Sequence, residues 1–267
     1  MKKLVRKIFS LVGLNISRAP AKGAPICWPS SGPIPQTYFE TDREFHEQYD
    51  LAQQKTKMVQ TDNALRRNRH YFLYHLIRQA PIRSGHVVEL GCWKGLSAFQ
   101  IANYLIQKRE DFGRQKFFIF DSFEGLSEIN AADRSRNASK LKSADQELRL
   151  RFATSLEVVQ SNLSCFSDLL VYLKGWIPER FHEVKNETFS FVHIDVDLYE
   201  PIKESIAFFY PRLATHGIMV FDDYGCAQFP GAKRAVDEFL LNTHDCIFVP
   251  TPTGSAFLVK LTDSLCH

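Results

Sequence analysis

The sequence contains few of the features that would assign it quickly to a class of protein. Its six cysteines lie far apart and form no C-x-x-C pair, which argues against a zinc site and against a disulfide framework. We therefore expect reduced cysteines and a cytoplasmic protein. The formal net charge is only +3, so no nucleic-acid partner is expected. No segment approaches the ~18 continuous apolar residues of a membrane-spanning helix.

The N-terminus also lacks the pattern of a cleavable signal peptide. Its short apolar stretch is interrupted by Arg6 and Lys7, and no small-residue cleavage site follows closely. Residues 1–14 could form a short amphipathic helix that contacts a membrane surface. We favour a frayed terminus over that alternative.

Proline, glycine and serine are concentrated between residues 18 and 37, which predicts an extended linker. From Thr61, capping residues are followed by apolar positions at helical spacing. These two features predict an N-terminal arm and linker over residues 1–60 and a folded domain over residues 61–267.

Short, continuous apolar runs are abundant, and stretches with helical patterning separate most of them. Such runs predict strands of a parallel sheet covered on both faces, and therefore an α/β fold. The last part of the chain has two strand-like runs around a Pro/Gly turn, which predicts an antiparallel hairpin. The five runs of the parallel sheet are residues 87–91, 117–121, 169–173, 191–195 and 217–221.

One segment interrupts this alternation of predicted strands and helices. Residues 127–150 are polar and charged, and they follow the second predicted strand directly. A solvated insertion is one interpretation. Because ligands bind at the carboxyl ends of strands in open α/β sheets, a mobile lid over a site is the other.

The first predicted strand runs into V-V-E-L-G-C-W-K-G-L-S, a glycine turn followed by a helix. Gly91 and Gly95 permit a tight turn and a close approach of a ligand to the backbone. The turn lacks both the phosphate loop and the G-x-G-x-x-G of dinucleotide binders. Its E-x-G-x-x-x-G-x-S spelling resembles the first motif of S-adenosylmethionine-dependent methyltransferases. The alternative is a tight turn with no ligand.

Asp121 stands at the end of the second predicted strand, in F-I-F-D-S-F. An acidic residue at this place can accept hydrogen bonds from both hydroxyls of a ribose. A helix-capping role is the alternative. Together with the glycine turn, Asp121 favours a cofactor that contains adenosine.

Paired carboxylates end two further strands, in F-V-H-I-D-V-D and V-F-D-D. A two-residue period places His193, Asp195 and Asp197 on one side of the first strand, and a parallel neighbour would bring Asp222 and Asp223 to the same sheet edge. Like charges this close would take up protons unless a cation lay between them.

Oxygen ligands alone suit Mg²⁺, with Mn²⁺ or Ca²⁺ as alternatives. Two interpretations compete with a metal site. The carboxylates could cap helices, or they could pair with a nearby base such as Lys203 or Arg234.

The chain from about Val87 to Leu240 resembles the macrocin O-methyltransferase family, the TylF-like group of sugar-hydroxyl methyltransferases. The resemblance rests on an ordered series of motifs: E-L-G-C-W-K-G-L-S, F-D-S-F-E-G-L, L-K-G-W, H-I-D-V-D-L-Y-E-P-I-K, F-Y-P-R-L, G-I-M-V-F-D-D-Y and P-G-A-K-R-A-V-D-E-F. It implies a Rossmann-like class I methyltransferase fold, with a mostly parallel seven-stranded sheet and the hairpin at its end.

The resemblance also implies roles for individual residues. Asp195, Asp222 and Asp223 would hold Mg²⁺, and Asp197 would be the general base. Gly175 and Trp176 would lie near the adenine. The residues expected to bind S-adenosylmethionine are Glu89, Gly91, Cys92, Trp93, Ser97, Asp121, Ser122, Phe123, Gly175 and Trp176.

The expected reaction is methylation of a hydroxyl on a sugar or a glycosylated small molecule, by a chain that forms a homo-oligomer. His193 is a competing base, although a place inside the core is favoured for it. A catechol-type methyltransferase acting on a phenol and an inactive S-adenosylmethionine-binding scaffold are the alternative functions.

Overall fold

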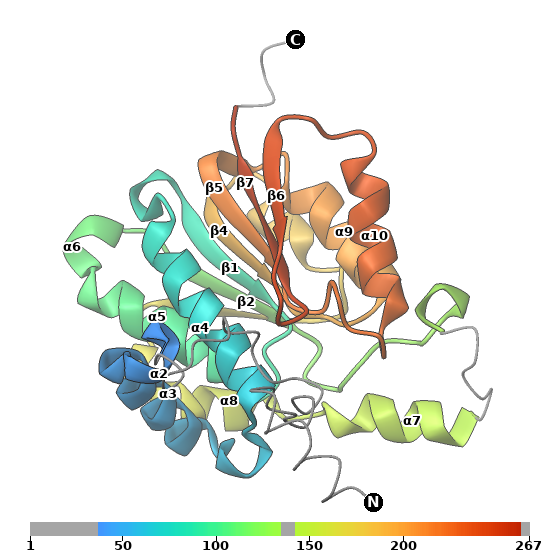
Figure 1. The fold of residues 1–267 in the computed structure, drawn as a ribbon, viewed down its shortest axis with the longest axis horizontal. Coiled ribbons are helices and arrows are strands. Elements are labelled where there is room, and N and C mark those ends of the chain that lie inside the picture. Colours follow the sequence, from blue (N-terminus) through green and yellow to red (C-terminus); the bar gives the residue numbers. More distant parts are fainter. Residues whose placement is uncertain (1–36, 135–141, 263–267) are drawn as a thin grey trace, which may run out of the picture. The chain divides into compact units, whose positions relative to one another are not determined.

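The computed structural model describes residues 37–134 and 142–262 (Figure 1). The predictions for residues 1–14 and for nearly all of the Pro-rich stretch fall outside this part. The chain divides into two units, one up to Thr41 and one from Asp42 onward. In the first unit the short helix α2, Tyr38–Thr41, is described, and the backbone N–H of Thr37 donates to Glu40 Oε2.

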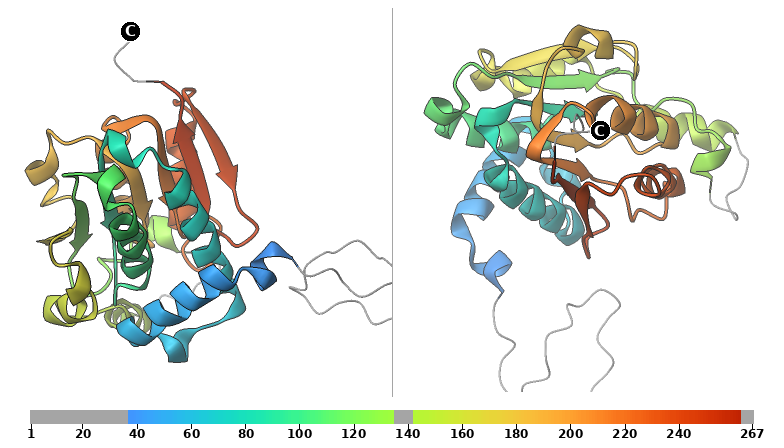
Figure 2. Two further views of the ribbon diagram at one scale, coloured as in Figure 1. Left: turned by 90° about the vertical axis from the view of Figure 1, so that its left-hand side faces the viewer. Right: turned by 90° about the horizontal axis from the view of Figure 1, so that it is seen from above.

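The second unit contains a seven-stranded sheet in the order β3-β2-β1-β4-β5-β7-β6. The first five strands are parallel, whereas β7 is antiparallel to both β5 and β6, as the sequence predicted. The hairpin β6–β7 lies at one edge of the sheet (Figure 2). The strands are β1 His86–Leu90, β2 Phe117–Asp121, β3 Leu170–Lys174, β4 Phe189–Ile194, β5 Leu213–Phe221, β6 Cys246–Pro250 and β7 Ala256–Lys260.

Helices cover both faces of the sheet, with α4 and α5 on one face and α9 and α10 on the other (Figures 1 and 2). This explains why the parallel strands are continuously apolar. The helices of this unit are α3 Arg43–Thr56, α4 Ala64–Gln79, α5 Leu96–Gln107, α6 Arg109–Phe112, α7 Lys142–Arg151, α8 Leu156–Asn162, α9 Tyr199–Phe209 and α10 Pro230–Leu240.

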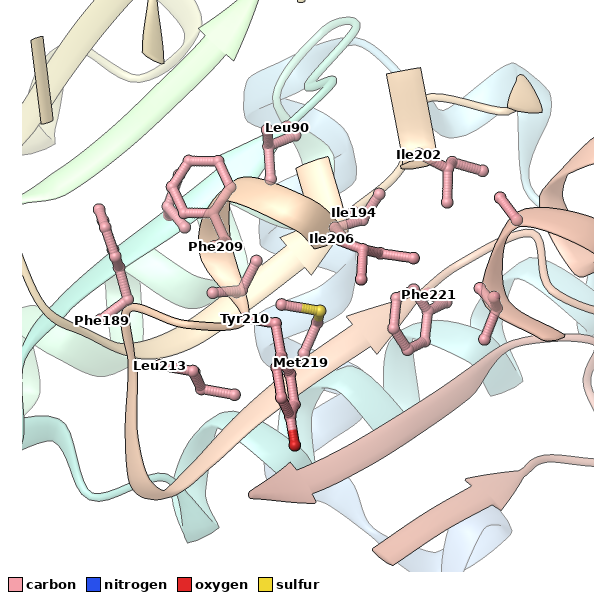
Figure 3. Close-up of a cluster of buried hydrophobic side chains, with 14 of the residues drawn as sticks. Leu90, Phe189, Ile194, Ile202, Ile206, Phe209, Tyr210, Leu213, Met219 and Phe221 are labelled. Carbon is pink, nitrogen blue, oxygen red and sulfur yellow. The ribbon is translucent and has the colours of Figure 1, made fainter. Parts of the chain in front are cut away.

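The core under α9 and α10 is built from large apolar side chains (Figure 3). Leu90, Ile194 and Phe221 project from the ends of three neighbouring strands and are at most 2% exposed. They pack against residues of α9 such as Ile206 and Phe209. This packing fixes the strand ends that Asp195 and Asp222 directly follow.

The compact unit begins earlier than the boundary predicted at residue 61. Asp42 caps α3 by accepting a hydrogen bond from the backbone N–H of Phe45 at 3.0 Å. Phe45, Tyr49 and Ala52 are fully buried, at the spacing of one helix face. The helix therefore belongs to the domain core, and the composition of the preceding linker does not extend over it.

The segment predicted as an insertion or lid is held at both of its ends. The backbones of Leu126 and Arg149 are hydrogen-bonded, and the Arg149 guanidinium also donates to the Leu126 carbonyl. Near the start of the segment, Asp133 accepts the backbone N–H of Tyr199 at 2.6 Å. Residues 135–141 lie outside the described part, so closure as a lid stays a prediction.

We expect replacement of Phe45 by Ala to lower the free energy of unfolding by about 3–5 kcal/mol, because it leaves a cavity in the core. Leu51→Ala is the matched control on the same helix, since Leu51 is 42% exposed; it should cost about 0.5 kcal/mol or less. Urea denaturation of both variants measures the difference. Equal losses would mean that α3 is not packed into the domain.

Candidate active site

A cavity of about 350 Å³ lies at the carboxyl ends of the parallel strands. Residues at the ends of β1 to β5 contribute to its lining, and one wall is formed by α4 and the segment before it. The strand order reverses between β1 and β4, where open α/β sheets bind their ligands.

The register of the sheet aligns the ends of β1, β4 and β5. Leu90 pairs with Ile194, and Ile194 pairs with Phe221. The hydrogen-bond ladder continues one residue further, because the Asp195 N–H donates to Leu90 O at 2.8 Å and the Asp222 N–H donates to Ile194 O at 3.0 Å. Asp195 and Asp222 are therefore held side by side by the backbone itself.

Asp195, Asp222 and Asp223 form an acidic cluster, in which one oxygen from each residue lies within 4.8 Å of the others. Within the described part of the chain, Asp223 Oδ2 is buried and has no hydrogen-bond partner. An unpartnered carboxylate oxygen beside two others is the donor set of a hard divalent cation. The cluster therefore fits the Mg²⁺ site that the sequence predicted.

The electrostatics of the acidic cluster reflect its burial. Burial and the charge of Asp222 raise the pKa of Asp223 to about 6. Burial and the charges of Asp222 and Asp223 also raise the pKa of Asp195 well above its usual range. Burial acts in the same direction on Asp222, but the nearby His193 and the charge of Arg69 outweigh it and lower the pKa of Asp222.

Arg69 on α4 pairs with the acidic cluster. Its Nη1 lies 2.6 Å from Asp222 Oδ2 and 3.4 Å from Asp223 Oδ1. The two bases considered from the sequence were wrong. Arg234 pairs with Glu238 at 2.8 Å, and the Lys203 ammonium lies 5.4 Å from the ring centre of Tyr199.

The helix-cap interpretation of the acidic residues is also wrong. Leu198 precedes α9 and Phe229 precedes α10, and neither residue makes a side-chain cap hydrogen bond; the first N–H of α9 is bound by Asp133, which is not part of the acidic cluster. The carboxylates of the acidic cluster thus face the cavity without serving a helix.

Asp197 lies beside the acidic cluster and lines the same cavity. It is 8% exposed, and its backbone has φ +59°, a conformation that costs most residues other than glycine about 1–2 kcal/mol. Burial and the charges of Asp223 and Asp195 raise the pKa of the Asp197 carboxyl. A strained backbone that aims a buried carboxyl at a cavity is the kind of feature that functional sites retain.

His193 and Glu89 form a buried pair at the cavity, in which His193 belongs to the lining and Glu89 lies behind it. His193 Nδ1 and Glu89 Oε1 are 2.9 Å apart, and the side chains are 1% and 0% exposed. Although burial favours a neutral ring, Asp222 and Glu89 raise the pKa of His193 to about 10. The contact with Glu89 fits the hydrogen bond inside the core that the sequence favoured for His193, although the ring also lines the cavity.

The glycine turn after β1 requires Gly91. The backbone there has φ +80°, and a Cβ at this position would lie 2.0 Å from the carbonyl oxygen of Asp195. No residue with a side chain fits between β1 and the end of β4 at this point. The turn lines the cavity together with Cys92, Trp93 and Ser97.

Asp121 joins the glycine turn to the loop after β2. Its carboxylate accepts the backbone N–H groups of Cys92 at 2.8 Å, Trp93 at 3.2 Å and Phe123 at 2.7 Å. A carboxylate offers about four lone-pair positions, so roughly one remains for a ligand in the cavity. That position can accept one ribose hydroxyl, whereas the sequence predicted contacts with both.

The structure brings most of the predicted cofactor residues to one cavity and leaves two out. Glu89 and Phe123 are both buried and neither is among the lining residues, so their contacts with a cofactor stay predictions. The predicted residues that line the cavity are Gly91, Cys92, Trp93, Ser97, Asp121, Ser122, Gly175 and Trp176.

The sequence analysis missed the wall formed by α4 and the segment before it, which includes Met58, Asn63, Arg66, Arg69 and His70. Its residues lie far in sequence from every recognised motif. The signal that could have indicated this wall was the arginine-rich part of the predicted helix, and such a pattern is equally typical of a solvent-exposed helix face.

Comparisons with known proteins agree with this architecture. The profile of the Macrocin-O-methyltransferase (TylF) family matches residues 43–246. The demethyldecarbamoylnovobiocin O-methyltransferase of Streptomyces niveus is 26% identical over 163 residues, which cover 58% of each protein. A second relative is the 8-demethyl-8-(2,3-dimethoxy-alpha-L-rhamnosyl)-tetracenomycin-C 4′-O-methyltransferase of Streptomyces olivaceus. It is 28% identical over 52% of this chain and 53% of its own length.

The chain thus matches a little over half the length of these two relatives. Among solved structures, the O-methyltransferase NovP has a TM-score of 0.60 and 22% identity over 73% of this chain and 80% of its own. At this level of identity the likeness concerns the fold. Among the described residues, no helix has the length and apolar character needed to cross a membrane.

The backbone conformation of Asp197 can be tested by stability alone. Asp197→Gly and Asp197→Ala both remove the buried carboxyl, but only glycine adopts φ +59° without strain. We expect the glycine variant to be more stable than the alanine variant by about 1 kcal/mol in urea denaturation. Equal stability of the two variants would contradict the left-handed conformation.

Proposed function

The chain belongs to the macrocin O-methyltransferase (TylF) family, and from that premise we propose that it is an S-adenosylmethionine-dependent and Mg²⁺-dependent O-methyltransferase. Its acceptor is a hydroxyl of a sugar or of a glycosylated small molecule. The observation that carries the proposal is a single cavity in which the glycine turn and Asp121 meet the acidic cluster.

The cofactor half of the site is the part around Asp121. One lone-pair position of its carboxylate remains for a ribose hydroxyl, and the glycine turn allows the backbone to approach the ligand. Gly175 and Trp176 follow β3, beside the end of β2, where they would border the adenine. The indole N–H of Trp93 is buried and, within the described residues, finds no hydrogen-bond partner, so it is available to a ligand.

The acceptor half is the part around the acidic cluster. When bound, S-adenosylmethionine supplies an activated methyl group, and a divalent ion supplies positive charge that makes a nearby hydroxyl more acidic. Asp195, Asp222 and Asp223 would hold the ion, with Mn²⁺ or Ca²⁺ as substitutes for Mg²⁺. Asp197 would accept the proton of the reacting hydroxyl, because it lines the cavity directly beside them.

A sugar acceptor is favoured over a phenol on two grounds. The name of the relative from Streptomyces olivaceus specifies a rhamnosyl group on its substrate. In addition, an aspartate, Asp197, stands where catechol-type enzymes typically rely on a lysine. A panel of vicinal-diol sugars and catechols, assayed for methyl transfer, separates the two acceptor classes.

Cofactor binding is tested with S-adenosylhomocysteine, the reaction product, by titration calorimetry. Asp121→Asn removes a charge that holds three backbone N–H groups and faces the ligand. Because a hydrogen bond to a charged group contributes about 1.5–3 kcal/mol, the dissociation constant should rise by roughly 10- to 150-fold. Asp168→Ala, an exposed carboxylate just before β3, should bind as the wild type does. Unchanged affinity of Asp121→Asn would contradict the placement of the cofactor.

The role of Asp197 is tested by turnover. Asp197→Asn keeps the size of the side chain but cannot accept the proton, so kcat should fall by about 10²–10⁴-fold. Binding of S-adenosylhomocysteine and of metal should stay unchanged in this variant, as measured by calorimetry. Full activity of Asp197→Asn would remove it as the base, whereas loss of all activity together with loss of cofactor binding would indicate a damaged fold.

Two further expectations belong to this proposal. The widely spaced cysteines favour a cytoplasmic location, and we expect a homo-oligomer. Light scattering coupled to size-exclusion chromatography measures the oligomeric state directly.

A further inference from the structure

Arg69 has no part in the reaction proposed above, yet it contacts the acidic cluster directly. Its side chain is only 17% exposed. Besides the contacts of Nη1 with Asp222 and Asp223, its Nε donates to the carbonyl oxygen of Thr253 at 3.1 Å. The residue thus joins α4, the end of β5 and the turn between β6 and β7.

These contacts place the positively charged guanidinium of Arg69 against two of the three carboxylates that would hold a divalent ion. The arginine guanidinium keeps its positive charge at every pH of interest. In a cavity with limited access to water, a fixed positive charge strongly opposes the entry of a second one. The same charge compensates the carboxylates for as long as no metal is bound.

We propose that Arg69 competes with the divalent ion for Asp222 and Asp223, and so sets the metal affinity of this methyltransferase. The inference rests on the proposed function, because it requires that the acidic cluster binds metal. In the metal-free protein Arg69 neutralises part of the cluster. Metal entry then requires that Arg69 releases oxygens of Asp222 and Asp223, while its bond to the Thr253 carbonyl can remain.

The charge count gives the direction of the effect. With all three carboxylates ionised, the acidic cluster carries a charge of −3, and Arg69 makes the net charge of the site less negative by one, whatever the contribution of His193. Metal affinity rises with the net negative charge of the ligands. Removing the arginine charge should therefore tighten metal binding, whereas removing a residue that merely orients the carboxylates would weaken it.

A matched pair of variants on α4 provides the test. Arg69→Met removes the competing charge and keeps most of the apolar stem. Arg67→Met is the control, because Arg67 lies on the same helix and pairs with Asp50 at 2.8 Å and Asp62 at 2.7 Å, outside the cavity. The probe is Mn²⁺ alone, titrated into purified full-length protein and followed by electron paramagnetic resonance of the free ion.

We expect Arg69→Met to bind Mn²⁺ at least tenfold more tightly than the wild type, and Arg67→Met to stay within threefold of it. An Arg69→Met affinity equal to or weaker than that of the wild type overturns the proposal. If Arg69→Met does not fold, Arg69→Gln replaces it, because glutamine donates hydrogen bonds to carboxylates without a charge. The same tenfold gain is expected for this variant, and its absence is equally decisive.

Calorimetry with S-adenosylhomocysteine on the same samples separates this proposal from the proposed function. If every variant binds S-adenosylhomocysteine and none binds Mn²⁺, the competition is overturned while the cofactor half of the site stands. If the wild type and both variants bind neither ligand, the proposed function fails together with the competition.

Discussion

The mutual repulsion of carboxylates at the ends of β4 and β5 is the constraint on which the rest of the site depends. Asp195 and Asp222 cannot move apart, because the backbone ladder that holds Leu90, Ile194 and Phe221 in register also fixes the residues that follow. Packing beneath α9 and α10 makes that register rigid. The protein can therefore lower the repulsion only by proton uptake or by bringing positive charge to the cluster.

Positive charge reaches the acidic cluster from two directions. His193 lies beneath it, held by Glu89, with Nε2 at 3.9 Å from Asp222 Oδ1. Arg69 approaches from α4, on the cavity side. A divalent ion would be a third source, and it is the one suited to chemistry, because it can be shared with a substrate hydroxyl. Asp121 plays the complementary part on the cofactor side, since it fixes the two loops that an adenosine would contact.

Much of this arrangement follows from the sequence. Continuous apolar runs predicted the parallel strands, and acidic residues directly after them predicted a convergent site, because parallel strands end at one edge. Glu89 was harder to place, since its contact with His193 depends on the register between β1 and β4. The contact of Arg69 with the acidic cluster could not be predicted, because Arg69 is 153 residues from Asp222 and tertiary packing sets the path of α4 along the cavity. The early start of the domain was missed for a related reason. The buried face of α3 follows soon after a Pro-rich stretch, and no change in composition marks where the linker ends.

The central claim is that one cavity holds the cofactor and a divalent ion side by side. A crystal structure of the protein grown with S-adenosylhomocysteine and Mn²⁺ tests this most directly, because manganese is located by its anomalous scattering. We expect an anomalous peak between Asp195, Asp222 and Asp223, with the ribose of the ligand at Asp121. Strong density for the ligand at Asp121, with Arg69 still on Asp222 and no manganese at the acidic cluster, would contradict it.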